Sequence, residues 1–345
     1  MEPVTHFLTG AVLARAGFNR KSALTTLVMT LAAEAPDIDM LAFLRGSDYG
    51  FIQHRGITHT LVGVPFVAGL VVAIVWLGDS LWQRLRRRNP LPPRRWGWLF
   101  LFACIAVLSH LLLDFTNSYG LRPFYPFLRQ WYAWDIVFII EPLMLAVLFA
   151  ALALPWLFGL VGQEIGERQR GPRGRGMAIV ALVLIAALWG LRDHEHRRAL
   201  VTIDAFEYNG EAAQRVAAFP YMVNPFRWTG VAETSTAYTA MTVDTLMPGV
   251  QSRTQNYFRP EPTPATEAAR NSEFGRAYVE WARFPLLEAE HLSSPNGEEL
   301  VRLLDVRFMN PDYSNRRRRP LEAYVLLDSH LHPIEQGFGT PKELR

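Results

Sequence analysis

The hydrophobic pattern divides the chain near residue 192. Before this point, four apolar runs approach or exceed the roughly 20 residues that a helix needs to cross a bilayer core. They cover residues 60–78, 96–115, 136–161 and 177–191. Largely apolar runs of this length predict membrane-spanning helices.

Two shorter apolar segments, 4–17 and 22–35, come before these runs and are joined by a basic turn. Each predicts a helix of about 14 residues, roughly 21 Å long at 1.5 Å per residue. That length is short for a span. The pair either dips into the membrane as a hairpin or lies on its surface as amphipathic helices.

After residue 192 the pattern changes to alternation of apolar and polar residues between turn residues, which is typical of strands. Residues 238–243 and 322–327 are the clearest predicted strands. The sequence therefore predicts an α-helical integral membrane domain of five to six helical elements over residues 1–192. A mostly β (α+β) soluble domain over residues 193–345 follows it.

Arginine-rich segments predict the orientation in the membrane. Residues 83–95 and 162–176 are both rich in arginine, and short basic loops stay in the cytoplasm. Since successive spans must alternate, the end of the 96–115 run lies at the outer face, and the C-terminal domain is predicted to be extracytoplasmic. The net charge of +3 comes from these loops, so no nucleic-acid partner is predicted. The single cysteine, Cys104, lies inside an apolar run, which excludes a disulfide framework or a cysteine metal site.

The second long run ends with two ionisable residues, His110 and Asp114. Positions four apart lie on one face of a helix, so the two side chains lie on the same face at the end of an apolar helix. Ionisable groups in a span are typically paired, metal-bound or exposed to water, and they mark a functional site. The alternative is a histidine that caps its helix beside an aspartate.

Further candidate ligands lie at the same predicted membrane face. Pro36 ends the second short helix, and Asp37 and Asp39 follow it; on an extended strand they would point to one side and converge on an ion. A simple helix-ending turn is the alternative. His6 starts on the same side if the two short helices form a hairpin.

The segment before the first span carries His54, Arg55 and His59. The two histidines converge only if one lies in the loop and the other at the helix start. Arg55 has the planar fork that binds phosphate or carboxylate in a bidentate manner. Asp135 precedes the third long run and is expected to line the site, while Glu141 lies deeper.

These residues occur in recognisable blocks: Thr5-His6 with Gly10, Pro36-Asp37-Ile38-Asp39, His54-Arg55-Gly56-Ile57-Thr58-His59, and His110-Leu111-Leu112-Leu113-Asp114 with Gly120. The set resembles the membrane-bound metal-dependent hydrolases of bacterial inner membranes, including members described as LexA-regulated. The resemblance covers about residues 1–160, and HRGITH is its most specific part. Members of the family look like distant relatives of zinc-dependent phospholipase C.

The resemblance implies a multi-pass protein of the bacterial inner membrane with a metal site built from histidine and aspartate. Carried over position by position, the implied metal ligands are His6, Asp37, Asp39, His54, His59, His110 and Asp114. This set exceeds the four ligands of a structural zinc ion, so one to three ions are expected. Imidazole with carboxylate suits Zn²⁺ and also Mn²⁺ or Fe²⁺.

Such ions activate water for hydrolysis, with Asp37 or Asp135 as the general base and Arg55 as the clamp on substrate. The expected substrate is a membrane lipid or another small molecule, attacked at an ester or phosphoester at the outer face of the inner membrane. No particular protein partner is implied.

Two other functions stay open. In a transporter or partner-binding protein, the polar residues would line an ion pathway, but transporters place such residues near the middle of the bilayer. Here they cluster at one end of the predicted spans, which favours hydrolysis. A purely structural anchor for the C-terminal domain would leave the HRGITH block unexplained.

Overall fold

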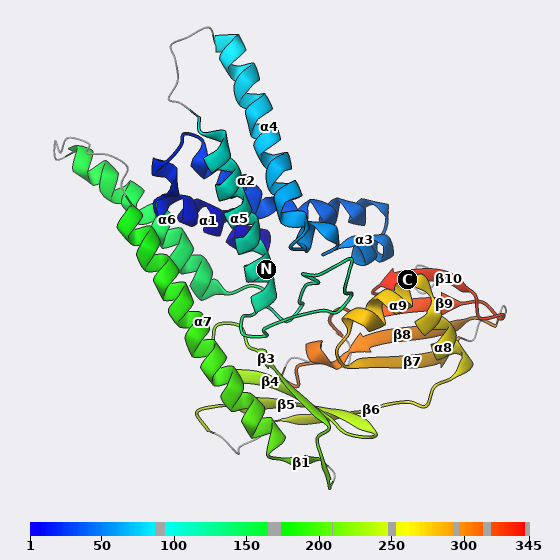
Figure 1. Ribbon diagram of the computed structural model, residues 1–345. Helices are drawn as coiled ribbons and strands as arrows, with labels where there is room; N and C mark the ends of the chain where they lie inside the picture. The colour runs from blue at the N-terminus through cyan, green and yellow to red at the C-terminus, as the bar shows by residue number, and fades with distance from the viewer. Residues whose placement is uncertain are drawn as a thin grey trace. The chain divides into compact units, whose positions relative to one another are not determined.

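A computed structural model of the chain describes residues 1–86, 94–164, 174–208, 210–247, 253–292, 297–312 and 319–341. Figure 1 shows the chain as a ribbon. It packs as two compact units. The first unit is Met1–Asp39 with Arg55–Leu191, and the second is Met40–His54 with Arg192–Arg345. Residues 40–54 thus belong to the second unit, although the residues before and after them belong to the first. The division into domains 1–192 and 193–345 stays a prediction.

The first unit begins with two short helices, as predicted. Helix α1 (Pro3–Arg15) starts at a proline, and the Glu2 side chain caps it by accepting hydrogen bonds from the Thr5 backbone. Helix α2 (Thr25–Glu34) follows a short 3-10 turn, η1 (Phe18–Arg20). A Cβ added at Gly10 would lie 2.7 Å from the Met29 carbonyl and 2.8 Å from Ala33 Cβ. Glycine therefore permits the close approach of α1 and α2.

Four longer helices follow: α4 (Gly63–Arg86), α5 (Trp96–Thr116), α6 (Pro142–Glu164) and α7 (Arg175–Asp204). Among the described residues, three helices are long and apolar enough to cross a membrane, Gly63–Leu85, Trp96–Thr116 and Arg175–Asp204, whereas Pro142–Phe158 is a shorter apolar helix. The third run was predicted to be helical from residue 136, which is wrong, because α6 starts only at Pro142. Proline disfavours helical backbone at the residue before it, and it suits the first position of a helix.

The predicted membrane topology stays a prediction. Most of the two arginine-rich segments on which it rests, residues 87–93 and 165–173, lies outside the described residues. The same holds for the extracytoplasmic placement of the C-terminal domain.

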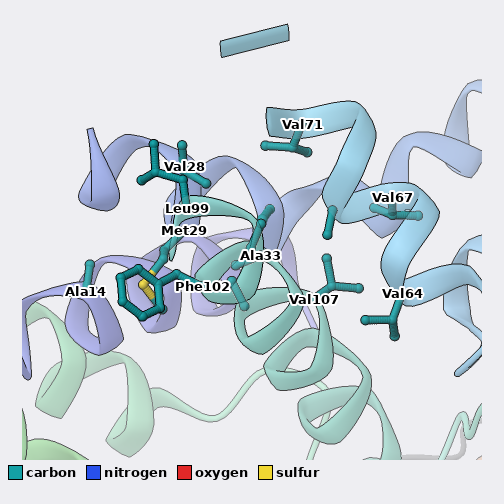
Figure 2. Packing of buried hydrophobic residues seen from close by; sticks show 14 of the residues in the cluster. Ala14, Val28, Met29, Ala33, Val64, Val67, Val71, Leu99, Phe102 and Val107 are labelled. Carbon is teal, nitrogen blue, oxygen red and sulfur yellow. The ribbon is translucent and has the colours of Figure 1, made fainter. Parts of the chain in front are cut away.

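Helix α5 lies at the centre of the apolar core of the first unit. Figure 2 shows this packing, in which small and branched side chains of α2 and α4 meet α5. The residues drawn include Val28, Met29 and Ala33 of α2, Val64, Val67 and Val71 of α4, and Leu99, Phe102 and Val107 of α5. Close packing of this kind gives α5 a fixed position, and the same helix carries His110 and Asp114.

The segment after α2 differs from the prediction. Residues Ala35–Arg45 form a 3-10 helix, η2, so the expected extended strand at Asp37 and Asp39 is wrong. Proline fixes φ near −65°, a value that suits the first turn of a helix, and Pro36 stands at this start. Helix α3 (Ser47–Gln53) and a second short 3-10 turn, η3 (Ile57–His59), complete the link to α4.

The second unit is mostly β, as predicted. One antiparallel sheet has the order β3-β4-β5-β6 and the other β10-β9-β8-β7. The strands of the first are Arg215–Pro220, Arg227–Glu233, Ala237–Asp244 and Thr254–Phe258 in the order β3 to β6. Strands β7 to β10 are Pro285–His291, Glu299–Asp305, Ala323–Leu327 and Pro333–Phe338. Both strands predicted from alternation, at 238–243 and 322–327, are confirmed.

Smaller elements complete this unit: a two-stranded pair, β1 (Glu207–Tyr208) and β2 (Glu211–Ala212), the helices α8 (Pro264–Asn271) and α9 (Glu273–Trp281), and a 3-10 turn, η4 (Val306–Phe308). Phe51 of α3 packs edge-on against Phe274, Trp281 and Phe338. These aromatic contacts explain why residues 40–54 belong to the β-rich unit.

Candidate metal centre

Five of the predicted ligands come together inside the first unit. His6 lies on α1, Asp37 on η2, His59 on η3, and His110 and Asp114 on α5. Their ligand atoms form two overlapping groups, each within 4.8 Å: His6, Asp37 and His110, and His59, His110 and Asp114. The three histidines are fully buried. Segments far apart in the sequence thus converge on one polar cluster.

The orientation of His110 is fixed by the main chain. Its Nδ1 lies 2.7 Å from the carbonyl oxygen of Ala33 on α2. A carbonyl only accepts, so Nδ1 carries the proton and Nε2 of the neutral ring presents a lone pair. That Nε2 atom lies 3.6 Å from Asp37 Oδ1 and 3.6 Å from Asp114 Oδ2. A lone pair that faces two carboxylates calls for a cation between them.

His59 stands between two aspartates. Its Nδ1 is 3.0 Å from Asp39 Oδ2, and its Nε2 is 3.3 Å from Asp37 Oδ1. The Nε2 atom also lies 3.2 Å from Nε2 of His110. Burial disfavours a proton on this ring, but the hydrogen bonds to Asp37 and Asp39 outweigh it and raise the pKa of His59. A metal ion bound by Nε2 of His59 would take the place of that proton, since metal and proton compete for one atom.

The contacts of Asp39 differ from those of Asp37. Oδ2 of Asp39 accepts hydrogen bonds from the backbone N–H of Arg55, at 2.9 Å, and from Thr58 Oγ1, at 3.0 Å. The same oxygen faces Nδ1 of His59, the nitrogen remote from His110. A carboxylate that orients a metal-binding histidine from behind is a common arrangement in metal sites. Thr58, inside the HRGITH block, is a supporting residue that sequence reasoning did not single out.

His6 contributes a third buried imidazole, and both of its ring nitrogens lack a hydrogen-bond partner. Its ring stacks on His110 with centroids 3.7 Å apart. Neither ring nitrogen makes a hydrogen bond, and Nε2 lies 3.5 Å from Asp114 Oδ1. Buried polar atoms are almost always satisfied, so two unsatisfied nitrogens beside a carboxylate fit the chemistry of a cation-binding site.

Arg55, which precedes η3, contacts Asp114 of the cluster and the loop that follows α5. Its Nη2 is 2.9 Å from Asp114 Oδ1, its Nη1 donates to the Gly120 carbonyl, and the guanidinium lies 4.6 Å from the Tyr119 ring centroid. The N-terminal ammonium group of Met1 also donates to Asp114 Oδ1. The Arg55 side chain is only 4% exposed. These contacts give Arg55 the geometry of a group that holds Asp114 in place, and a substrate clamp would have to give them up.

The other predicted residues lie outside these two groups. His54 belongs to the second unit, so its role as a ligand stays a prediction. Asp135 is buried and follows Trp134, whose N–H donates to the Phe115 carbonyl at the end of α5. Its role as a base also stays a prediction. Glu34, at the end of α2, is half-buried, and burial followed by the charge of Asp37 raises the pKa of its carboxyl group to about 7.

The donor set as a whole fits a divalent metal ion. It combines imidazole nitrogens with carboxylate oxygens, the ligands that Zn²⁺, Mn²⁺ and Fe²⁺ share. Two of the histidines have their remote nitrogen bonded to a carbonyl or a carboxylate, which is the support that metal-binding histidines usually have. The carbonyl of Ala33 supplies part of this support, and no side chain signals it in the sequence.

Comparisons with known proteins place the N-terminal part of the chain in a family. The family described as YdjM inner membrane protein matches residues 1–197. An uncharacterised protein of Bacillus subtilis (strain 168), YfhP, is 28% identical over 167 residues, which are 46% of this chain and 47% of the relative. The chain thus spans about half the length of this curated relative. No solved structure matches it. With its apolar helices and a family match over more than half of its length, the chain belongs to the YdjM inner membrane protein family.

Proposed function

We propose that this protein is a membrane-bound, metal-dependent hydrolase. The observation that carries the proposal is the buried cluster of His6, His59, His110, Asp37 and Asp114, in which nitrogen lone pairs and carboxylates face each other. The two nitrogens of His6 and the Oδ2 atom of Asp114 are buried there without a hydrogen-bond partner, which is unfavourable in a site with little water, and a bound cation would satisfy them. The family match supports the membrane location, and the resemblance at HRGITH supports the hydrolytic chemistry.

In this proposal the residues of the cluster have different roles. His59 and His110 offer Nε2 to the metal, while Asp39 and the Ala33 carbonyl hold the two rings from behind. Arg55 is a positioning residue that keeps Asp114 in place. A bound Zn²⁺, Mn²⁺ or Fe²⁺ would lower the pKa of water and stabilise negative charge on an attacked ester.

We assign proton uptake to Asp37. Its side chain is 14% exposed, against 1% for Asp114, so it is the more accessible of the two carboxylates to water and substrate. Asp135 is the second candidate base. General bases of this kind act on a proton within hydrogen-bond reach.

The substrate class follows from the location that we propose. The arginine-rich segments favour an orientation with the cluster at the outer face of the inner membrane and the C-terminal domain outside the cytoplasm. At that depth, the abundant esters are those of lipids. We therefore propose a phosphoester or carboxylic ester of a membrane lipid as the substrate, with membrane lipids as the main partners.

The proposal is tested by turnover of lipid esters. Detergent-purified protein, loaded with Zn²⁺, Mn²⁺ or Fe²⁺, is assayed against phospholipids labelled at the headgroup and at the acyl chain. Wild type is expected to release one of the labels, and His59→Ala combined with Asp114→Ala is expected to release none. His291→Ala, at a side chain that is 72% exposed on β7, is the matched control and should keep activity. Stoichiometric metal without turnover of any ester would favour an ion-binding or transport role instead.

A further inference from the structure

Two neighbouring loops of the second unit expose a cluster of apolar side chains. The loop between β3 and β4 carries Met222 and Val223, which are 48% and 54% exposed. The chain after β5 carries Leu246 and Met247, which are 61% and 65% exposed. The N–H of Thr245 donates to the Phe226 carbonyl at 2.9 Å, so the two loops are bonded to each other. We call these four side chains the apolar tip.

The backbone at Val223 makes this exposure more informative. Val223 has a φ of +67°, in the left-handed region. A β-branched residue is costly there, and glycine or asparagine is the usual choice. Val223 therefore serves neither the backbone conformation nor the core of its unit. An unfavourable residue at a strained position indicates that Val223 serves a contact with something other than the chain itself.

The apolar tip lies beside the part of α7 that directly follows its apolar run. The predicted span ends at residue 191, and Arg192 is the first charged residue after it. Nη1 of Arg192 donates to the Tyr221 carbonyl, next to Met222, at 3.3 Å. Nη2 of Arg198 donates to the Thr245 carbonyl, next to Leu246, at 2.7 Å. The two arginines are six residues apart, about 9 Å along the helix.

That spacing slightly exceeds one headgroup layer, since the two polar regions of a bilayer together add about 10 to 15 Å to its core, or roughly 5 to 8 Å on each face. If the apolar run of α7 spans the membrane, both loops are attached to α7 where the helix passes from hydrocarbon to water. Arg197 of α7 and Arg227 of β4 are exposed, with side-chain exposures of 76% and 39%, and they form ion pairs with Asp193 and Asp312. Cationic groups around an apolar tip suit an interface that contains anionic phosphates.

We propose that the apolar tip inserts into the surface of the membrane from which α7 emerges, so that the second unit is held against the bilayer by lipid contacts. The partner is the phospholipid interface itself. Met222 and Val223, bonded next to Arg192, lie deeper than Leu246 and Met247. Insertion gives the exposed apolar side chains the burial that the folded unit does not provide.

The test measures the depth of single labelled positions in the full chain. Cys104 is the single cysteine, so Cys104→Ala gives a cysteine-free background for Met222→Cys and Leu246→Cys. Thr236→Cys is the matched control, because Thr236 is exposed in the turn at the opposite end of strand β4. Each variant is labelled with an environment-sensitive fluorophore and reconstituted into nanodiscs of phosphatidylethanolamine and phosphatidylglycerol.

Lipids that carry a quencher in the upper acyl chain should quench the label at position 222 several-fold more than the label at 236, with position 246 between them. Iodide in the water phase should show the reverse order. Equal quenching of all three labels by iodide, with none by the lipid quencher, would overturn the proposal. Protection of 222 and 246 from both quenchers would also overturn it, because a protein surface such as a second copy of the chain would then cover the tip.

Discussion

The Nδ1 atom of His110 donates to the main-chain carbonyl of Ala33 across the contact between α5 and α2. This bond determines which nitrogen of the ring faces the carboxylates of Asp37 and Asp114. The packing of two apolar helices is therefore linked to the chemistry at their ends, because a shift of α2 along α5 would break the bond and turn the ring.

Replacing His110 should remove the ligand that both groups of the candidate site share. We expect His110→Ala to weaken binding of Zn²⁺ at least 100-fold, since even supporting residues of metal sites cost 10- to 100-fold. Competition with a chromophoric chelator measures the affinity. Ser109→Ala, one residue earlier on α5, is the control and should bind like wild type. Equal affinities of the two variants would contradict the assignment of His110.

The two aspartates of η2 should differ in their effects. Asp37 faces the nitrogens that point into the cluster, whereas Asp39 supports His59 from the other side. We expect Asp37→Asn to abolish stoichiometric metal binding. Asp39→Asn should lower the affinity by roughly 10- to 100-fold and leave the stoichiometry unchanged. The same chelator titration separates the two, and the reverse order of effects would show that Asp39 is the ligand.

Arg55→Lys tests whether Arg55 positions Asp114 or binds substrate. A lysine keeps the charge but cannot donate to Asp114 and to the Gly120 carbonyl in the same geometry. The loss of one hydrogen bond to a charged group should lower the free energy of unfolding by about 1.5–3 kcal/mol. Thermal unfolding in detergent measures this effect without substrate. An unchanged stability together with a raised KM would instead support the predicted substrate clamp.

Gly10→Ala should disturb the contact of α1 with α2 that holds His6 in place. The added Cβ would meet the Met29 carbonyl at 2.7 Å, inside normal contact distance. Overpacking of this kind costs typically 1–3 kcal/mol, so we expect a lower melting temperature and weaker metal binding. Gly78→Ala on α4 is the control, because nothing lies within 4 Å of a Cβ there. If Gly10→Ala matched this control, the close contact would not matter for the site.

The sequence predicted the elements that are defined by the pattern of apolar and polar residues over a short stretch of chain. Apolar runs located α4, α5 and α7, and alternation located β5 and β9. The four-residue spacing of His110 and Asp114 placed them correctly on one helix face. The start of α6 was missed because the apolar run extends through residues 136–141, while Pro142 decides where the helix begins.

Features that depend on contacts between residues far apart in the sequence could not be predicted from it. The backbone of Asp37 and Asp39 is helical, and nothing in the short Pro-Asp-Ile-Asp block distinguishes a 3-10 helix from an extended turn. The assignment of residues 40–54 to the β-rich unit depends on Phe51 meeting aromatic residues more than 200 positions later. The carbonyl of Ala33 and the hydroxyl of Thr58 gain their roles only from the fold.

The metal content of the purified protein tests the central claim most directly. Elemental analysis after dialysis should find Zn²⁺, Mn²⁺ or Fe²⁺ in stoichiometric amounts in wild type and in His291→Ala. The same metal should be absent from folded protein that carries His59→Ala and Asp114→Ala. A folded wild type that holds no metal, even after reconstitution with each of the three ions, would contradict the metal centre and the hydrolase proposal with it.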